Sequence, residues 1–361
     1  MSNIISFRPP AKPSRAQNLR ALMISLAQHR RAKDDVFWLK ENAEVLGMLA
    51  ATKTMVSAED LAPYAEFYDQ IEEKLQFFPQ YYRFFLSICL DLEDLGMAGQ
   101  KGEILCNRVA EARLVRAELS DLQRAETRRL LARRGVSYRR GTSRIDDRLR
   151  RFAERAETFA LPNKKAAYEL THIVFYLSEY GRKDPQLSRS FITSLEFTGV
   201  LAYLDHNHDL LAEVCTALHF AGIRPSPVWN EGVAQAHALI MPQSEVPEYP
   251  RNDAFHTYLV TGWAQTVLGG ASFAAQIPDG PVYFLSNLQQ CSVLLPLSES
   301  LYRLGRLRSG DWSKMRSHVL AALDLPCQGV LMRAESSTEE FAAFFEGFAR
   351  ANENWPAEEA G

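Results

Sequence analysis

The chain has 361 residues, which is enough for one large hydrophobic core or for two domains of ordinary size. Hydrophobic residues make up 47% of it and charged residues 24%, a composition that excludes an intrinsically disordered chain. The formal net charge of −3 indicates no particular class of partner.

The cysteines and the N-terminal residues point to the cytoplasm. None of the five cysteines forms a Cys-x-x-Cys pair, and residues 1–15 lack the apolar core of a secretion signal. We therefore expect reduced thiols and a cytoplasmic location. Residues 254–278 contain no Asp, Glu, Lys or Arg, but polar side chains and the Gly269-Gly270 pair make them too polar and too broken for a membrane span. No membrane insertion is expected.

Helical periodicity dominates the first half of the chain. Residues 1–14 contain proline and arginine and are expected to form a flexible arm. We expect helices over residues 15–31, 35–50, 57–79, 81–95, 103–134 and 144–159. Ser57 and Asp60 have the spacing of a capping box, and Gly96 and Gly135 are stop signals.

The second half shows the same periodicity. We expect helices over residues 164–180, 187–204, 209–221, 228–241, 252–268, 296–306, 311–323 and 338–351. Extended structure is expected only around residues 281–285, 290–295 and 329–332. In residues 254–298 the only charged residue is Asp279, so this segment must be largely enclosed, either by the fold or by a partner.

These elements predict an all-α protein with few or no short strands. Leu161-Pro162-Asn163 combines a break with a cap signal and marks the expected boundary between two regions. Residues 15–160 are predicted to form a helical bundle. Residues 163–335 are predicted to form an α/α toroid-like domain or an array of helical hairpins with a cavity. Residues 336–361 should form a C-terminal helix and tail.

The helix expected over residues 164–180 is apolar on nearly every side, yet it carries ionisable residues. Because each residue turns the helix by about 100°, one narrow arc contains Glu169, His172, Tyr176 and Glu179. Carboxylates and imidazoles are rarely buried unless they are paired, bound to a metal or placed around a polar cavity. The structural alternative for His172 is a core histidine bonded to a neighbouring acid or carbonyl.

Glu169 and His172 also have the spacing that places two metal ligands on one helical face. The chain has no second Glu-x-x-His, so a di-iron site is not expected. A single divalent metal stays open. Its candidate ligands are His172, Asp205, His206 and His208. The alternative makes His206 and His208 solvated loop residues beside Asp209, which can cap the next helix.

A second polar line lies on the helix expected over residues 252–268. His256 begins this helix, and Gly262 in its middle indicates that another group packs very close. The line beside His256 consists of Tyr258, Thr261 and Gln265. It is either the single polar seam of a core helix, or it faces the ionisable arc of the 164–180 helix across an internal cavity.

Three segments together resemble a group of poorly characterised bacterial all-helical proteins: ELTHIVFYLSEYG at 169–181, DLLAE at 209–213 and FHTYLV at 255–260. The likeness covers about residues 165–270. Those proteins are similar to α/α-toroid enzymes, in which inner helices line a central cavity. The resemblance implies that the cavity residues are His172, Glu179, Asp209 and His256. This chain has Phe-His-Thr-Tyr where the pattern has a second Thr, and the group brings no activity to transfer.

Positive charge is concentrated in residues 113–155, which contain fourteen arginines and six acids. The densest part contains Arg128, Arg129, Arg133, Arg134, Arg139 and Arg140. The ordinary interpretation is a solvated helical hairpin paired with acidic neighbours, and the alternative is an arm that docks a protein or a nucleic acid. The interleaved acids speak against nucleic acid.

Two functional hypotheses follow. In the first, a polar-lined cavity in the second half binds a small molecule, with His172 or His256 as acid or base and Glu169 or Glu179 orienting the imidazole. The expected ligand contacts are Tyr176, Asp209, Tyr258 and Gln265. In the second, a non-catalytic scaffold binds a protein through residues 254–298 and the arginine-rich helices. No Walker or Rossmann motif is present, so no nucleotide cofactor is expected, and the sequence names no reaction.

Overall fold

The computed structural model describes residues 13–138, 144–245, 253–270, 273, 275–288 and 292–351. Regular structure in these ranges is mostly helical, with one two-stranded sheet, so the predicted all-α class is confirmed. The expected N-terminal arm and C-terminal tail lie almost wholly outside the described residues.

Nine α-helices, joined in places by short 3-10 turns, make up the described part of the first half. They are α1 (Arg15–Gln28), α2 (Val36–Ala51), α3 (Ala58–Leu61), α4 (Ala65–Phe77), α5 (Tyr82–Asp94), α6 (Lys101–Glu111), α7 (Asp121–Ala132), α8 (Ile145–Ala153) and α9 (Ala156–Phe159). The predicted capping box is present: the backbone N–H of Asp60 donates to the Ser57 hydroxyl, and the N–H of Ser57 donates to the Asp60 carboxylate.

The single long helix expected over residues 103–134 is wrong, because the chain forms α6 and α7 there, separated by a turn. Arg113 has a φ of 55°, a left-handed conformation that cannot continue an α-helix. Ser120 then starts α7 with a capping box of its own to Gln123. The helix expected over residues 144–159 likewise divides into α8 and α9 at Arg155, which has a non-helical backbone.

The second half contributes a further set of helices and both strands. These elements are α10 (Lys164–Leu177), α11 (Arg189–Leu204), α12 (His208–Phe220), α13 (Pro227–Ala238), β1 (Ile240–Gln243), α14 (Phe255–Val267), β2 (Tyr283–Ser286), α15 (Leu294–Leu304), α16 (Trp312–Ala322), α17 (Leu325–Glu335) and α18 (Phe341–Ala349). The strands pair antiparallel, with Ile240 opposite Ser286.

Of the three segments expected to be extended, only 281–285 forms a strand, β2. The described end of 290–295 enters α15, and 329–332 lies inside α17. Helix α17 forms because the Asp324 side chain accepts a hydrogen bond from the N–H of Cys327, and a proline occupies the first turn. This cap outweighs the short apolar run that suggested a strand.

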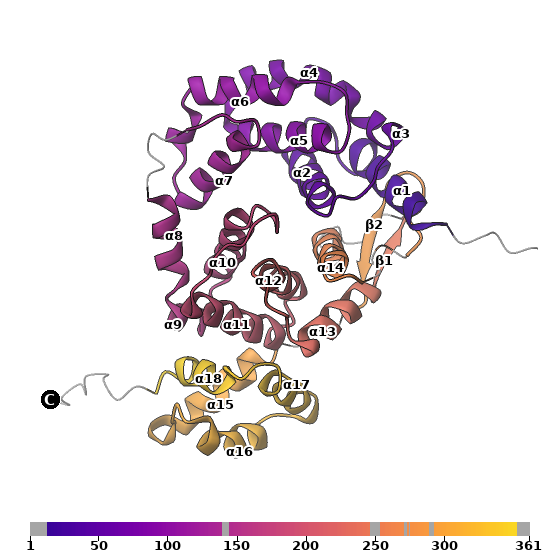
Figure 1. Ribbon diagram of the computed structural model, residues 1–361. Coiled ribbons are helices and arrows are strands. Elements are labelled where there is room, and N and C mark those ends of the chain that lie inside the picture. Colours follow the sequence, from indigo (N-terminus) through magenta and orange to yellow (C-terminus); the bar gives the residue numbers. More distant parts are fainter. Residues whose placement is uncertain are drawn as a thin grey trace, which may run out of the picture.

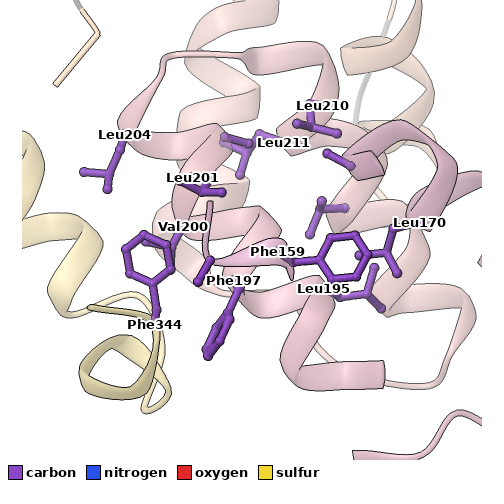
Figure 2. Close-up of a cluster of buried hydrophobic side chains, with 14 of the residues drawn as sticks. Phe159, Leu170, Leu195, Phe197, Val200, Leu201, Leu204, Leu210, Leu211 and Phe344 are labelled. Atoms are coloured by element: carbon purple, nitrogen blue, oxygen red, sulfur yellow. The ribbon is translucent and has the colours of Figure 1, made fainter. Parts of the chain in front are cut away.

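Helix α11 lies at the centre of the larger hydrophobic cluster, where α8, α9, α10, α12, α13, α17 and α18 pack around it. Figure 2 shows Phe159 of α9, Leu170 of α10 and Phe344 of α18 beside Leu195 and Val200 of α11, all of them buried. Burial of large apolar side chains is the main stabilising contribution in such a core.

A second hydrophobic cluster joins the first-half helices to α14 and the strands. Tyr258, Leu259 and Phe284 belong to it, so the fold itself encloses much of the described part of residues 254–298. The buried Arg30 fixes this junction: its guanidinium donates to Glu41 at 3.0 Å and to Asp253 at 2.8 Å. The predicted division of the chain at residues 161–163 stays a prediction.

Helices from both halves of the chain surround a common centre in Figure 1. Helices α2, α5 and α7 lie on one side of it and α10, α12 and α14 on the other, while α4 and α6 lie outside α5. Helices α15 to α18 form a separate group beyond α11 and α13. In the described ranges, no helix combines the length and the apolar composition needed to cross a membrane.

Candidate functional site

A pocket with a volume of about 520 Å³ lies where six helices meet. This size suits a small organic molecule. Its ionisable lining residues are Lys40, Glu44, Arg83, Asp91, Glu126, Arg129, Arg133, His172, Glu179, Arg182, Glu213 and His256. Its aromatic lining residues are Phe84, Tyr168, Phe175, Tyr176, Tyr180 and Trp263. The sequence placed Glu169, His172, Tyr176 and Glu179 on one arc of a helix. The last three line this pocket, and Glu169 does not.

His256 is held at the pocket by Asp209. The two residues come from the first turns of α14 and α12, and the His256 Nδ1 lies 3.0 Å from the Asp209 Oδ2. Asp209 is not the cap of α12, as the sequence suggested; Asn207 is, because its side-chain oxygen accepts from the N–H of Leu210. Asp209 accepts from the same N–H at 3.0 Å through its Oδ1, while its Oδ2 faces His256 on the neighbouring helix.

The charges around His256 favour its protonated form. Burial by itself would lower the pKa of His256, but the hydrogen bond to Asp209 and the negative charges of Glu44 and Asp209 outweigh burial, so the pKa is raised. Burial likewise opposes ionisation of Asp209, yet the His256 bond prevails and the pKa of Asp209 is lowered. An ionised Asp209 can only accept, so the His256 Nδ1 carries the donated proton and Nε2 is the nitrogen left for exchange.

Glu44 of α2 completes this end of the pocket from the first half of the chain. Its carboxylate oxygen lies 3.9 Å from the His256 Nε2. Burial raises the pKa of Glu44, although the charges of His256 and Lys40 partly oppose the change. Glu44 is thus the acidic group nearest to the exchangeable side of this imidazole among the residues that the structure describes.

A second imidazole–carboxylate pair joins α10 to α12. The Thr171 hydroxyl donates to Glu213 at 2.5 Å, and the His172 Nε2 lies 3.8 Å from the same carboxylate oxygen. Burial raises the pKa of Glu213 despite the opposing effects of His172 and Thr171. His172 is therefore a half-buried residue at the pocket wall, with the fully buried Glu213 behind it.

These two pairs give the pocket groups suited to proton transfer. Asp209 has a lowered pKa while Glu44 and Glu213 have raised ones, and such separation assigns different protonation states to neighbouring acids. The lining residues include one aliphatic hydroxyl, on Ser87, and it donates to Asp91 at 3.1 Å. The described lining thus offers acids and bases; apart from Ser87 its hydroxyls are those of tyrosines, and it includes no thiol.

Tyr176, a predicted ligand contact, lines the pocket next to His172, with their ring centroids 6.0 Å apart. Glu179 also lines the pocket, but its carboxylate accepts from Lys183 at 2.7 Å. Among the described contacts it therefore does not orient an imidazole, the role the sequence suggested for it. Asp209 takes that role for His256.

Two predicted ligand contacts lie elsewhere. Tyr258 is fully buried and stacks on His237, whose ring centroid is 4.7 Å away. Gln265 is not among the lining residues, and its side-chain nitrogen is buried without a described partner. The polar line on α14 is thus divided, because His256 faces the pocket while Tyr258 and Thr261 face the core.

The four metal-ligand candidates are not gathered at one point. The rings of His206 and His208 stack 5.8 Å apart, and Asp205 accepts from the Ser292 hydroxyl at 2.7 Å. Burial lowers the pKa of His208 to about 4. In the part of the chain that the structure describes, no group of three or more His, Cys, Asp or Glu side chains is placed to hold a metal.

The arginine-rich helices are largely paired with acids of the same chain. Arg128 pairs with Asp146 of α8, and Arg133 bonds to Asp91 of α5 at 2.7 Å. Arg134 pairs with Glu93 at 2.8 Å. Arg139 and Arg140 lie outside the described residues. The described ion pairs match the expected pairing with acidic neighbours, but the side chains of Arg133 and Asp91 are largely buried rather than solvated, and α7 also lines the pocket.

Sequence reasoning missed Glu44, Glu213 and Arg129 as pocket residues. A signal existed for the two acids: each interrupts the apolar stretch of a helix, α2 or α12, that has little other charge on its buried side. Arg129 was hidden among its arginine neighbours. Only the packing of α7 against α10 distinguishes it from Arg128, the preceding residue of the chain.

The fold and the pocket together define a mostly helical protein whose lining carries two imidazole–carboxylate pairs. The chain belongs to the family described as a domain of unknown function, DUF6902, whose model matches residues 1–351. Family membership thus extends well beyond the 165–270 segment that carried the bacterial resemblance. No curated protein and no solved structure gives a significant match.

Proposed function

We propose that the pocket binds a small organic molecule and exchanges a proton with it through His256. The observation that carries this proposal is the 3.0 Å contact between the His256 Nδ1 and the Asp209 Oδ2 at the pocket wall. A carboxylate bound to one ring nitrogen fixes the tautomer and leaves the other nitrogen available as a base.

His256 would act as the base or acid, and Asp209 would position it. Glu44 lies 3.9 Å from the Nε2 and can receive or return the proton, because burial raises its pKa toward that of the imidazole. The His172–Glu213 pair supplies a second acid–base group on the same wall. We assign proton transfer as the reaction class because the groups beside His256 are the carboxylates of Asp209 and Glu44.

The enclosing architecture and the compartment belong to the same proposal. A toroid-like arrangement of α2, α5, α7, α10, α12 and α14 around the pocket would shield the ligand from water, which strengthens electrostatic interactions there. A cytoplasmic location fits the buried, reduced thiols of Cys89, Cys106 and Cys215. No metal is required by this mechanism.

The scaffold hypothesis has less support from the contacts. Much of the described part of residues 254–298 is buried within the fold, and the described arginine-rich helices are paired internally. The scaffold hypothesis needs these two surfaces to be exposed and unpaired, and in the described residues they are largely neither.

A thermal-shift screen with small carboxylates, phosphates, sugars and amino acids tests the proposal. Compounds that raise the melting temperature of the wild-type protein are carried forward and tested with His256→Asn and with the control His318→Asn, whose histidine is exposed on α16. Each compound found is then incubated in D₂O, and NMR follows the loss of its exchangeable C–H signals. Exchange with the wild type and not with His256→Asn supports proton transfer. Exchange that is as fast with His256→Asn as with the wild type contradicts it.

A further inference from the structure

Arg129 differs from the other cations that line the pocket. The other lining cations, Lys40, Arg83, Arg133 and Arg182, each have a carboxylate within 4.0 Å. Arg129 has no such carboxylate among the described residues, although it lines the same pocket. Its nearest acid along α7, Glu126, is bound by Arg83. A guanidinium left unpaired in a pocket is suited to an anion from outside the chain.

The position of the Arg129 guanidinium is fixed by two aromatic rings. Its Cζ lies 4.8 Å from the ring centroid of Tyr180 and 5.7 Å from that of Tyr176. Stacking holds the plane of the guanidinium and leaves its edge, which carries the N–H groups, free to bond. The Nε is buried and has no hydrogen-bond partner in the described structure. A bidentate oxyanion would satisfy it.

We propose that Arg129 binds an oxyanion group, a carboxylate or a phosphate, of the molecule that occupies the pocket. The ligand is then a small organic anion. Proton exchange at its other end rests on the function proposed above, whereas the contact between the anion and Arg129 does not. Tyr176 contacts both Arg129 and His172. The anion site and the His172 imidazole are therefore separated by a single aromatic side chain, a span that one small metabolite can cover.

Arginine is suited to this role because its planar fork matches two oxygens of a carboxylate or phosphate. Arg128 provides a matched comparison on the same helix. It pairs with Asp146 and does not line the pocket. The two neighbouring residues thus carry the same charge in different surroundings, and only one should respond to an anion.

Isothermal titration with inorganic phosphate and, separately, with acetate tests this assignment, with chloride holding the ionic strength constant. The wild type, Arg128→Gln and His256→Asn should bind the preferred anion equally. In Arg129→Gln the dissociation constant should rise by about tenfold or more. Preference for phosphate or for acetate identifies the group on the ligand. Binding in His256→Asn keeps this result separate from any failure of the proton-transfer proposal.

A second measurement avoids any folding defect of Arg129→Gln. Phenylglyoxal modifies arginines, and peptide mapping of the wild-type protein reports each site. The anion should protect Arg129 and leave the modification of Arg128 unchanged. Equal modification of Arg129 with and without either anion, or unchanged affinity in a folded Arg129→Gln, overturns the assignment. So does the absence of binding by both anions.

Discussion

Helix α14 carries His256 on its pocket face and packs against His237 of α13 on its core face. The surroundings of these two histidines shift their pKa values in opposite directions. On the pocket face, His256 is bonded to Asp209, and its pKa is raised because that bond and nearby carboxylates outweigh burial. On the core face, His237 stacks on Tyr258 and contacts the Thr261 hydroxyl, and burial lowers its pKa to about 4. Partners, rather than burial alone, thus separate a group able to exchange protons from a structural one.

The largest effect should come from emptying the core face. Tyr258 is fully buried between His237, Phe273 and Phe284, so Tyr258→Ala should lower the free energy of unfolding by about 3–5 kcal/mol. Its hydroxyl has no described hydrogen-bond partner. Tyr258→Phe should therefore leave stability nearly unchanged or raise it. Urea unfolding of both variants measures the difference, and a large loss in Tyr258→Phe would show that the hydroxyl is needed.

Much of the helical framework was predictable because its signals are local. Apolar spacing and caps such as Ser57 with Asp60 depend on residues a few positions apart, and the structure has them. The errors also have local causes. Arg113 adopts a left-handed backbone conformation that the local sequence does not predict. Asp324 caps a helix in a stretch whose apolar run predicts a strand. The sequence pattern alone does not show whether one capping or left-handed residue or a neighbouring apolar run decides the local structure.

The pocket was predictable only in part, because it depends on contacts between distant helices. His172 and His256 stood out as ionisable residues on apolar helices, and both line the pocket. Tyr258 lies at helical spacing beside His256 but faces the core, since the 3.6-residue period does not say which arc faces which neighbour. Arg129 is distinguished by its contacts with Tyr176 of α10 and Tyr180 in the turn that follows, and no spacing within α7 encodes these contacts.

The lowered pKa of His237 predicts acid sensitivity of the core face. Between about pH 4 and 6.5 the unfolded chain binds a proton that the folded chain refuses, so stability rises with pH over this window. This residue should account for a loss of about 3 kcal/mol when the pH falls from 7 to 4. His237→Phe keeps the ring stacking and cannot titrate.

Urea unfolding at a series of pH values compares the wild type with His237→Phe. Between pH 7 and pH 4 the unfolding free energy of the variant should fall by about 3 kcal/mol less than that of the wild type. His208, whose pKa is also lowered to about 4, gives the remaining slope the same sign. Equal slopes for the two proteins would mean that His237 is protonated as readily in the fold as in the unfolded chain.

Two glycines inside helices provide a finer comparison of the core and the pocket. A Cβ on Gly262 of α14 would lie 2.7 Å from the Phe273 ring and 3.0 Å from His237, so Gly262→Ala should destabilise the protein by about 1–3 kcal/mol. A Cβ on Gly47 of α2 would lie 3.4 Å from the Asp91 carboxylate, an ordinary contact. Gly47→Ala should be neutral or stabilise the helix by up to about 1 kcal/mol. Thermal unfolding of both variants tests whether the core face is the more tightly packed.

The smallest effect concerns the pocket face itself. The raised pKa of His256 means that the folded chain binds its proton more tightly than the unfolded chain does. The stabilisation from this pair is fully present below the ordinary pKa of histidine and is lost as the pH rises through the raised value, the opposite sign to His237. Asp209→Asn removes the carboxylate and should return the pKa of His256 toward or below 6.5.

NMR titration of the imidazole C–H signals measures this change residue by residue, with His256→Asn for assignment. The midpoint of His256 should lie above 6.5 in the wild type and fall in Asp209→Asn. An unchanged midpoint would show that Glu44, 3.9 Å away, maintains the charge by itself. Glu44 of α2, rather than Asp209, would then be the residue that positions the base. The reacting group would depend directly on a residue from each half of the chain.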